Sequence, residues 1–274
     1  MEINDIKLLK DKSKELRIDT LKMIFQAGSG HLGGSYSIAE ILSVLYFKEM
    51  RIDPKRPYWE NRDRLVLSKG HVCPIVYAAL AKKGYFPLEE LETLRKIGSR
   101  LQGHPDMKKL PGIDMTSGSL GNGLGIGTGM SIGAKVDNRD FRVYVILGDG
   151  ELQEGSVWEA AMYSANKKLD NLVVIIDKNN LQVDGFVNDI NRIDPLDEKW
   201  RSFGFHVITI DGHNIEEIYE ALQEAKTIKG KPTCIIAKTV KGKGVEFFEN
   251  VCEWHGKAPN EEEYSKALIE LEEA

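Results

Sequence analysis

The stretch FRVYVILGDG, residues 141–150, decides the fold. Its apolar run over 141–147 predicts a strand buried on both faces, and the Gly148-Asp149-Gly150 turn predicts where that strand ends. A helical pattern follows over 156–168, and a second apolar strand over 172–176 ends shortly before Asn179. Two buried strands joined by a helix are typical of a parallel sheet that is covered by helices on both faces.

The same alternation continues on both sides of this stretch. Further strands are predicted over 64–68, 206–210 and 233–237, and helices over 5–27, 37–49, 74–84 and 215–226, with another helix starting at Leu88 and a helix-prone acidic tail over 261–274. No internal repeat, low-complexity segment or linker interrupts the pattern. We therefore expect one α/β domain over residues 1–274, in which a mostly parallel sheet lies between two helical layers.

Composition and charge exclude several classes of protein. The 274 residues are 42% hydrophobic and 29% charged, which is an ordinary balance for a folded domain. Lysine and arginine number 37 against 42 aspartates and glutamates, and the net charge of −5 gives no reason to expect a nucleic-acid partner. Cys73, Cys234 and Cys252 are too few and too scattered for a disulfide framework or a zinc site.

No segment of the sequence predicts secretion or membrane insertion. Residues 1–14 are charged throughout and lack the apolar core of a secretory signal. The uncharged segment 115–134 is long enough to span a bilayer, but its Gly, Ser, Thr and Asn content makes it a poor membrane span. We therefore expect a soluble, cytoplasmic protein with no membrane partner.

Glycine crowds the segment 118–133 without matching a nucleotide-binding motif. No G-x-G-x-x-G register fits there, because no glycine stands at the last position of any register, and no G-x-x-x-x-G-K-[ST] occurs. A nicotinamide-dependent dehydrogenase and a P-loop nucleotidase are therefore disfavoured. Two compatible interpretations remain. Glycines 121, 125, 129 and 133 form one helix face that packs tightly on another helix, and Gly118-Ser119-Leu120 presents backbone N–H groups to a phosphate at a helix start.

The turn after the 141–147 strand carries a candidate cation ligand. Asp149 lies there, and Asn179 follows the next strand 30 positions later. If these strands are neighbours, both side chains reach the crevice outside the carboxyl ends of the sheet, where α/β proteins bind ligands. With a nearby backbone carbonyl such as that of Leu181, they form a small oxygen shell that suits Mg²⁺ or Ca²⁺. Alone, an aspartate at such a place is most often only a turn residue.

G-D-G followed after nearly thirty residues by N-N resembles the thiamine diphosphate motif, and the wider sequence resembles the transketolase family. The matching motifs occur in the family order and cover most of the chain: Ser29-Gly30-His31, L-S-K-G-H over 67–71, Gly103-His104-Pro105, T-S-G-S-L-G-N-G over 116–123, G-D-G-E-L-Q-E-G over 148–155, K-T-V-K-G-K-G over 238–244 and Trp254-His255-Gly256. Each motif alone is weak, but the ordered set is very specific.

The resemblance implies a diphosphate-binding domain of the thiamine diphosphate type and assigns its site. Asp149 and Asn179 would bind the divalent metal, Mg²⁺ with Ca²⁺ or Mn²⁺ as alternatives, together with the backbone carbonyl of Leu181. The residues implied to contact thiamine diphosphate are His71, Gly118, Ser119, Leu120, Gly150, Asn179 and His255. The catalytic residues implied to line the substrate channel are His31, His104 and His255, which would hydrogen-bond substrate hydroxyls and help move protons.

The resemblance covers only the first part of a full transketolase chain, which is more than twice as long. The pyrimidine-binding and C-terminal domains, and the glutamate that promotes ylide formation, would lie on a second polypeptide. We therefore expect the N-terminal subunit of a split transketolase, assembled as α2β2 and active only together with that C-terminal subunit. Glu154 and Glu159 match family carboxylates at a subunit contact, with solvated charges as the alternative. The implied reaction is reversible two-carbon ketol transfer between ketose and aldose phosphates, as in the pentose phosphate pathway.

Two alternatives remain open. The chain is a subunit of another thiamine diphosphate enzyme, such as a 1-deoxyxylulose 5-phosphate synthase or a 2-oxo acid dehydrogenase, or it is a non-catalytic module of the same fold. The G-E-L-Q-E-G run over 150–155 and the W-H-G-K-A-P run over 254–259 favour the transketolase branch. Intact Asp149, Asn179 and histidines argue against a non-catalytic module.

Overall fold

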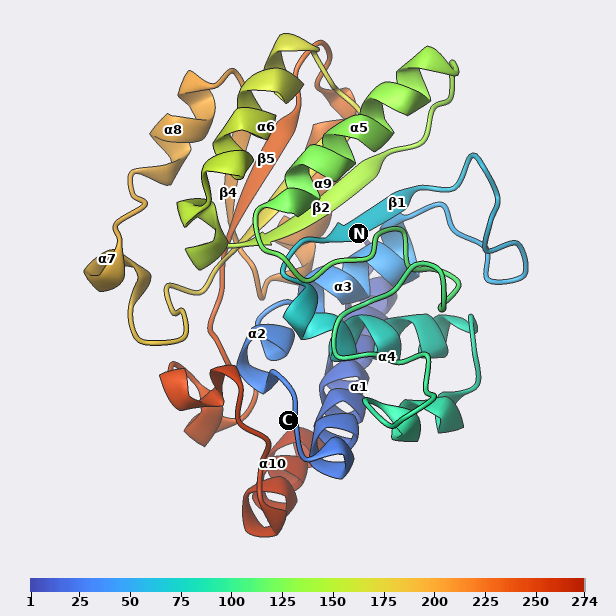
Figure 1. Cartoon of the computed structure of the whole chain (residues 1–274), viewed down its shortest axis with the longest axis vertical. Helices are drawn as coiled ribbons and strands as arrows, with labels where there is room; N and C mark the ends of the chain where they lie inside the picture. Colours follow the sequence, from blue (N-terminus) through green and yellow to red (C-terminus); the bar gives the residue numbers. More distant parts are fainter. Residues whose placement is uncertain (274) are drawn as a thin grey trace.

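The computed structural model describes residues 1–273 and contains one five-stranded sheet. The strands are β1 (Arg64–Leu67), β2 (Val143–Gly148), β3 (Leu172–Lys178), β4 (His206–Asp211) and β5 (Thr233–Lys238). They lie in the order β1-β2-β3-β5-β4, and every neighbouring pair is parallel (Figure 1). The parallel sheet predicted from the sequence is therefore confirmed.

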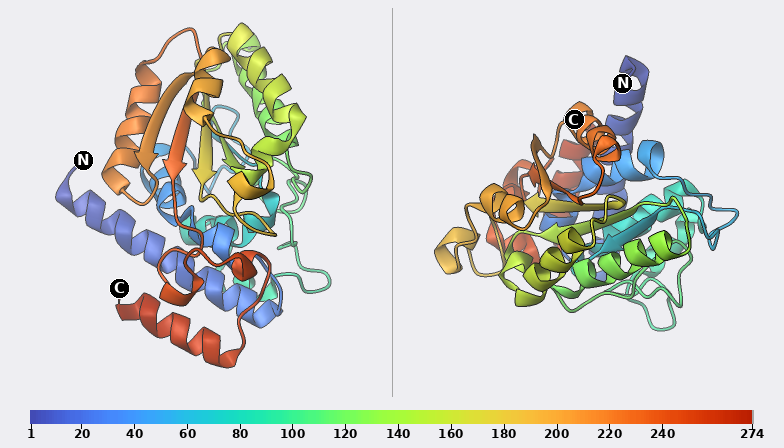
Figure 2. Two further views of the ribbon diagram at one scale, coloured as in Figure 1. Left: turned by 90° about the vertical axis from the view of Figure 1, so that its left-hand side faces the viewer. Right: turned by 90° about the horizontal axis from the view of Figure 1, so that it is seen from above.

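Helices cover both faces of the sheet, so the fold has three layers (Figures 1 and 2). One layer holds α5 (Asn122–Val136), α6 (Gly155–Asn166) and α8 (Leu196–Ser202), and the other holds α1 (Ile3–Ala27), α3 (Ala39–Val44), α4 (Cys73–Lys83) and α9 (Ile215–Thr227). Side chains of β2 alternate between the layers: Val143, Val145 and Leu147 face the first, whereas Tyr144 and Ile146 face the second. This double burial explains why the strand is apolar without interruption.

The remaining helices are α2 (Leu32–Tyr36), α7 (Val187–Ile190) and α10 (Glu261–Glu273). Two helix predictions differ from the structure. The helix expected over 37–49 is α3 followed by a π-helical turn over Leu45–Glu49. The helix expected from Leu88 is only a 3₁₀ segment over Leu88–Thr93, because the chain turns at Arg95, whose φ of 61° is left-handed. Within residues 1–273 no helix is both long and apolar enough to cross a bilayer.

The glycines of α5 serve close packing on the sheet rather than on another helix. A Cβ at Gly123 would lie 2.3 Å from the side chain of Ser68, and one at Gly127 would lie 2.4 Å from Cγ2 of Val145. Glycines 125, 129 and 133 are exposed and would meet nothing within 4 Å. The predicted helix–helix face over glycines 121, 125, 129 and 133 is therefore wrong, because the buried glycines belong to a different face of α5.

The segments that carry the predicted metal ligands meet at the carboxyl edge of the sheet. Asp149 follows β2 and Asn179 follows β3, and these strands are direct neighbours with Gly148 opposite Asp177. After β5 the chain crosses this edge and runs into α10, which packs on α1 (Figure 2). The fold thus brings the two strand-end polar side chains together, as the sequence predicted.

Candidate active site

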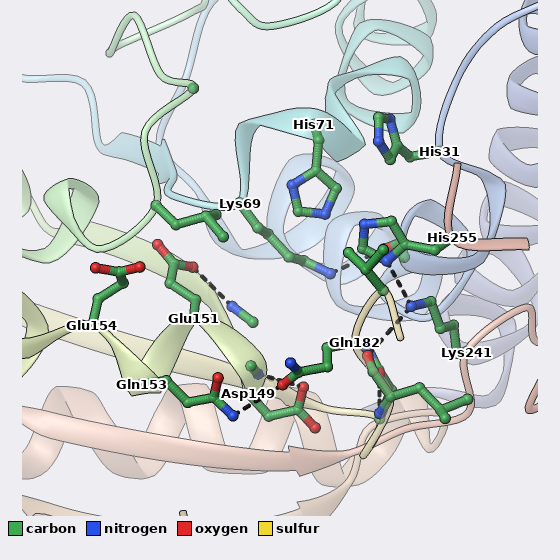
Figure 3. A pocket seen from close by; sticks show the side chains of 18 of the residues that line it. His31, Lys69, His71, Asp149, Glu151, Gln153, Glu154, Gln182, Lys241 and His255 are labelled. Atoms are coloured by element: carbon green, nitrogen blue, oxygen red, sulfur yellow. Dashed lines mark hydrogen bonds between the residues drawn. The ribbon is translucent and has the colours of Figure 1, made fainter. Parts of the chain in front are cut away.

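A cavity of about 420 Å³ lies at the carboxyl edge of the sheet (Figure 3). Its volume falls within the range of about 300–1,000 Å³ that is usual for cofactor and small-molecule sites. Turns after four strands and several loops from distant parts of the chain form its wall. The lining residues are His31, Gly34, Lys69, His71, His104, Gly118, Leu120, Gly148, Asp149, Gly150, Glu151, Gln153, Glu154, Asn179, Leu181, Gln182, Val183, Lys241 and His255.

Every site residue predicted from the sequence lines this cavity except Ser119. Ser119 faces an adjoining surface groove, which it shares with Gly118 and Ile126. Glu154 lies at the cavity wall, whereas Glu159 is exposed on α6. The structure thus brings together residues from seven motifs that are spread between positions 31 and 255.

Asp149 presents a buried carboxylate at one end of the cavity. The residue is 2% exposed, and its Oδ1 accepts a 2.8 Å hydrogen bond from the backbone N–H of Gly150, while Oδ2 accepts one from Asn180. Burial, followed by the nearby charge of Asp177, raises the pKa of Asp149 to about 7. No cation of the chain pairs directly with this carboxylate among residues 1–273, so a bound metal ion would compensate its charge.

Asn179 is oriented by Asp177, a fully buried carboxylate in β3. Nδ2 of Asn179 donates to Asp177 Oδ2 at 2.8 Å, which identifies the other side-chain atom as the oxygen acceptor. Lys69 Nζ and Ser37 Oγ donate to the same oxygen at 2.6 and 2.7 Å, and Thr239 donates to Oδ1. Burial alone would raise the pKa of Asp177, but Lys69 and these hydrogen bonds outweigh it and hold the pKa below its usual value. Asp177 therefore stays ionised and fixes the loops around the cavity.

Two buried lysines supply positive charge to the cavity. Lys69 is held by Asp177 and by the carbonyl of Gly34. Nζ of Lys241 lies 3.3 Å from the carbonyl oxygen of Leu181 and 2.8 Å from Nδ1 of His255. Burial, together with the charge of Lys69, lowers the pKa of Lys241 to about 8. Two ammonium groups beside a cation site are suited to an anionic ligand such as a diphosphate.

Three imidazoles gather at the other end of the cavity (Figure 3). The ring centroids of His31, His71 and His255 lie 4.9, 5.3 and 5.4 Å apart. Burial, reinforced by neighbouring positive charges, lowers the pKa of His31 to about 4, of His71 to about 2 and of His255 to about 3. All three are therefore neutral at pH 7 and able to donate or accept a hydrogen bond. Nδ1 of His31 is buried and has no partner among the described residues.

Glu151 organises the start of α5 next to the cavity. Its carboxylate accepts hydrogen bonds from the backbone N–H groups of Gly121 at 2.8 Å and Gly148 at 3.0 Å. The first helical N–H groups are thus used inside the protein, which corrects the expectation that the helix start itself receives a phosphate. No described residue accepts a hydrogen bond from the backbone N–H groups of residues 118–120, which precede the helix. These three donors remain available to a ligand.

The donor set fits a divalent metal ion and a diphosphate. Asp149, Asn179 and Leu181 offer a carboxylate, an amide oxygen and a carbonyl, which are the ligands that Mg²⁺ and Ca²⁺ prefer. No cluster of three or more His, Cys, Asp or Glu side chains able to hold a metal occurs in the described part of the chain. A cation at this edge would therefore need further oxygen ligands from water or from the diphosphate itself.

Sequence reasoning missed several residues of the cavity. Lys69 and Lys241 belong to motifs that were singled out, yet no role was assigned to either lysine. Their positions inside L-S-K-G-H and K-T-V-K-G-K-G were the available signal, because each follows a predicted strand. Asp177 is the last buried position of β3 and was interpreted only as part of the turn sequence. His206 and His213, expected to be structural, lie outside the cavity.

A parallel α/β fold with this pocket at the carboxyl edge is typical of enzymes that bind a phosphorylated cofactor. The model of the transketolase thiamine diphosphate binding domain matches residues 9–271. The chain therefore belongs to the transketolase family, of which it represents the thiamine diphosphate-binding domain.

Relatives of two architectures match this chain. It is 48% identical over 264 residues to the 6-deoxy-6-sulfo-D-fructose transketolase subunit of Clostridium sp. (strain MSTE9), covering 96% of each chain. It is 38% identical over 273 residues to one of the named subunits of the apulose-4-phosphate transketolase of Phocaeicola vulgatus, covering 96% of that relative. The crystal structure of transketolase from Campylobacter jejuni superposes with a TM-score of 0.92 at 35% identity, and the match covers 99% of this chain but 43% of that one.

Proposed function

We propose that this chain is the cofactor-binding, N-terminal subunit of a split transketolase, which transfers a two-carbon ketol unit between sugar phosphates. The observation that carries the proposal is the single cavity that joins an oxygen-rich end, two lysines and a cluster of neutral histidines. Its lengthwise match to named transketolase subunits, against 43% of a solved transketolase, supports the division into two chains.

The oxygen-rich end would hold metal and diphosphate. Asp149, Asn179 and the carbonyl of Leu181 would bind Mg²⁺, with Ca²⁺ or Mn²⁺ as substitutes. Lys69, Lys241, His71 and the backbone at Gly150 and 118–120 would surround the diphosphate. When bound, thiamine diphosphate supplies the carbanion that carries the two-carbon unit. The protein contributes orientation and charge compensation.

The histidines would manage protons on the sugar. His31, His104 and His255 line the cavity on the side away from Asp149, and neutral imidazoles can donate to a substrate oxygen or accept its hydroxyl proton. The lowered pKa values of His31 and His255 keep these groups neutral across the physiological range. His255 is additionally oriented by Lys241, which lies 2.8 Å from its Nδ1.

A partner subunit would complete the site with the pyrimidine-binding and C-terminal domains, and two such pairs would form an α2β2 assembly. Apolar side chains near the cavity support a covered surface: Ile126, Met162 and Tyr163 on α5 and α6, and Val183, Phe186 and Ile190 in the loop after β3, are all exposed in the isolated chain. Contiguous exposed apolar residues mark interaction surfaces. The open glycine face of α5 lies on the same side and permits close approach of another backbone.

The test is ketol transfer by the reconstituted pair with thiamine diphosphate and Mg²⁺, followed from xylulose 5-phosphate to ribose 5-phosphate. We expect Asp149→Ala to lower activity at limiting Mg²⁺ by at least about 100-fold, because even residues behind metal ligands contribute about 10–100-fold. Asp137→Ala, an exposed aspartate at the end of α5, is the matched control and keeps wild-type activity. Pyruvate-dependent condensation in place of ketol transfer, or equal activity of the two variants, would contradict the proposal.

A further inference from the structure

We propose that Arg95 binds the anionic group of the sugar substrate, a phosphate or a sulfonate, at the histidine end of the cavity. The inference rests on the proposed function and names a substrate-binding residue that the sequence motifs do not contain. It is carried by where the guanidinium lies, by how the chain holds it there and by its lack of a counter-ion.

The guanidinium of Arg95 lies between the two loops that carry His31 and His104. Its Nη1 donates a 3.1 Å hydrogen bond to Oγ of Ser29, two residues before His31. On the other side it packs against Gly103, the residue before His104, where a Cβ would lie 2.9 Å from Cζ of Arg95. Glycine at position 103 therefore leaves the space that the guanidinium occupies.

The backbone aims the side chain at this position. Arg95 has a left-handed φ of 61°, which is uncommon for a residue with a Cβ. Its N–H donates to the carbonyl of Leu101 at 2.9 Å and closes the loop over residues 95–101. A residue held in a sparsely populated backbone region, with its side chain fixed at both ends, is a pattern found at binding sites.

Arg95 carries a charge that the protein does not neutralise. No carboxylate within residues 1–273 lies within 4.0 Å of its guanidinium, whereas Arg100 in the same loop forms two bonds to Glu90, at 2.5 and 2.8 Å. The positive charge of Arg95 contributes, after burial, to the lowered pKa of both His31 and His104. An exposed cation beside two neutral imidazoles attracts an anion that enters with the sugar.

The chemistry separates this cation from the two lysines. Lys69 and Lys241 lie with Asp177 and Leu181 near the proposed diphosphate, while Arg95 lies beyond the histidines that would contact sugar hydroxyls. The planar guanidinium offers paired donors that match the oxygens of a phosphate or a sulfonate. A terminal sugar anion is thus the ligand that this position fits.

The test compares charged and uncharged donors in the reconstituted pair. Steady-state KM and kcat are measured for fructose 6-phosphate, for 6-deoxy-6-sulfofructose and for the uncharged ketose erythrulose. We expect Arg95→Gln to raise KM for both charged donors at least about tenfold more than KM for erythrulose, with kcat for the charged donors little affected. Arg95→Lys should recover part of that loss. Arg100→Gln, which removes the paired arginine of the same loop, is the control and keeps wild-type kinetics.

The arms separate the anion types and the possible failures. A KM increase for only one charged donor identifies that anion as the ligand, whereas equal KM increases for charged and uncharged donors, or no increase, would overturn the inference. Binding of fructose 6-phosphate to the same complex is titrated by calorimetry, independently of turnover. Arg95-dependent binding without ketol transfer would reject the proposed function and leave this inference standing. Arg95-independent binding with normal ketol transfer would do the reverse.

Discussion

At the scale of single residues, the cavity depends on charges that are either compensated or deliberately neutral. Asp177 accepts from four donors and stays ionised, whereas Asp149 keeps a raised pKa because no cation of the chain reaches it. The histidines are kept neutral by burial. An unfolded chain would protonate those imidazoles below their ordinary pKa near 6.5, so acid favours unfolding.

The strongest such effect belongs to His71, whose folded pKa of about 2 lies well below the unfolded value. Between pH 7 and pH 5 the unfolded state binds a proton at this residue and the folded state does not, so stability falls as the pH falls. We expect His71→Gln to reduce the loss of unfolding free energy over this interval by up to about 2 kcal/mol. Urea unfolding of the isolated chain at both pH values measures it.

The matched control for His71 is Gln182→Ala, which alters a residue of the same cavity without adding or removing a titratable group. It should retain the wild-type difference between pH 7 and pH 5. If His71→Gln shows that same difference, the imidazole is not held neutral in the folded chain.

At the scale of elements, α5 joins the sheet and the exterior through two different glycine faces. Gly123 and Gly127 allow the helix to approach β1 and β2, and the glycines at 125, 129 and 133 leave an open outer surface. The two sets have the same four-residue spacing, so their roles differ only through packing.

Alanine substitutions distinguish these faces. Gly127→Ala places a Cβ 2.4 Å from a methyl group of Val145, and we expect it to lower the unfolding free energy by about 1–3 kcal/mol. Gly129→Ala meets no atom and should raise it by about 0.5–1 kcal/mol, because alanine loses less backbone entropy in a helix. Urea unfolding of the isolated variants tests both, and effects of the same sign would contradict the assignment of faces.

The loop after β3 is a second element with few contacts of its own. It is held by a bridge between Leu181 and Phe186 and by Gln153, which donates to Gln182 and Asn191 at 2.9 Å. We expect slower amide hydrogen exchange over 181–195 and 98–118 when partner and cofactor are bound than in the free chain. Equal protection in both states, measured by mass spectrometry, would show that neither segment is covered.

Much of this arrangement was predictable from local patterns, and the remainder depended on contacts between distant segments. Apolar strands ending in polar turns place Asp149 and Asn179 at one sheet edge, since neighbouring parallel strands end together. The spacing of glycines does not reveal which face of α5 is buried, because both sets repeat every four residues. Arg95 reaches the histidines only through the closure of its loop onto Leu101 and the gap at Gly103, which no local pattern encodes.

At the scale of the whole molecule, the chain exposes the surfaces that an assembly would cover. The glycine face of α5 and its apolar neighbours form one such surface. Replacing Gly129 with arginine adds a long charged side chain to that face without meeting any atom of the isolated chain. We expect Gly129→Arg to fold normally but to shift the assembly from α2β2 toward single αβ pairs in analytical ultracentrifugation. An unchanged mass would place the contact between pairs elsewhere.

The central claim is that this chain carries half of a ketol-transfer site. The most direct measurement titrates the partner subunit into a fixed amount of the chain, with thiamine diphosphate, Mg²⁺ and sugar phosphates in excess, and records the rate of ketol transfer. The claim predicts no turnover without partner and a rate that rises to a plateau at equal amounts of the two chains. Turnover by this chain alone, at the rate of the mixture, would contradict it.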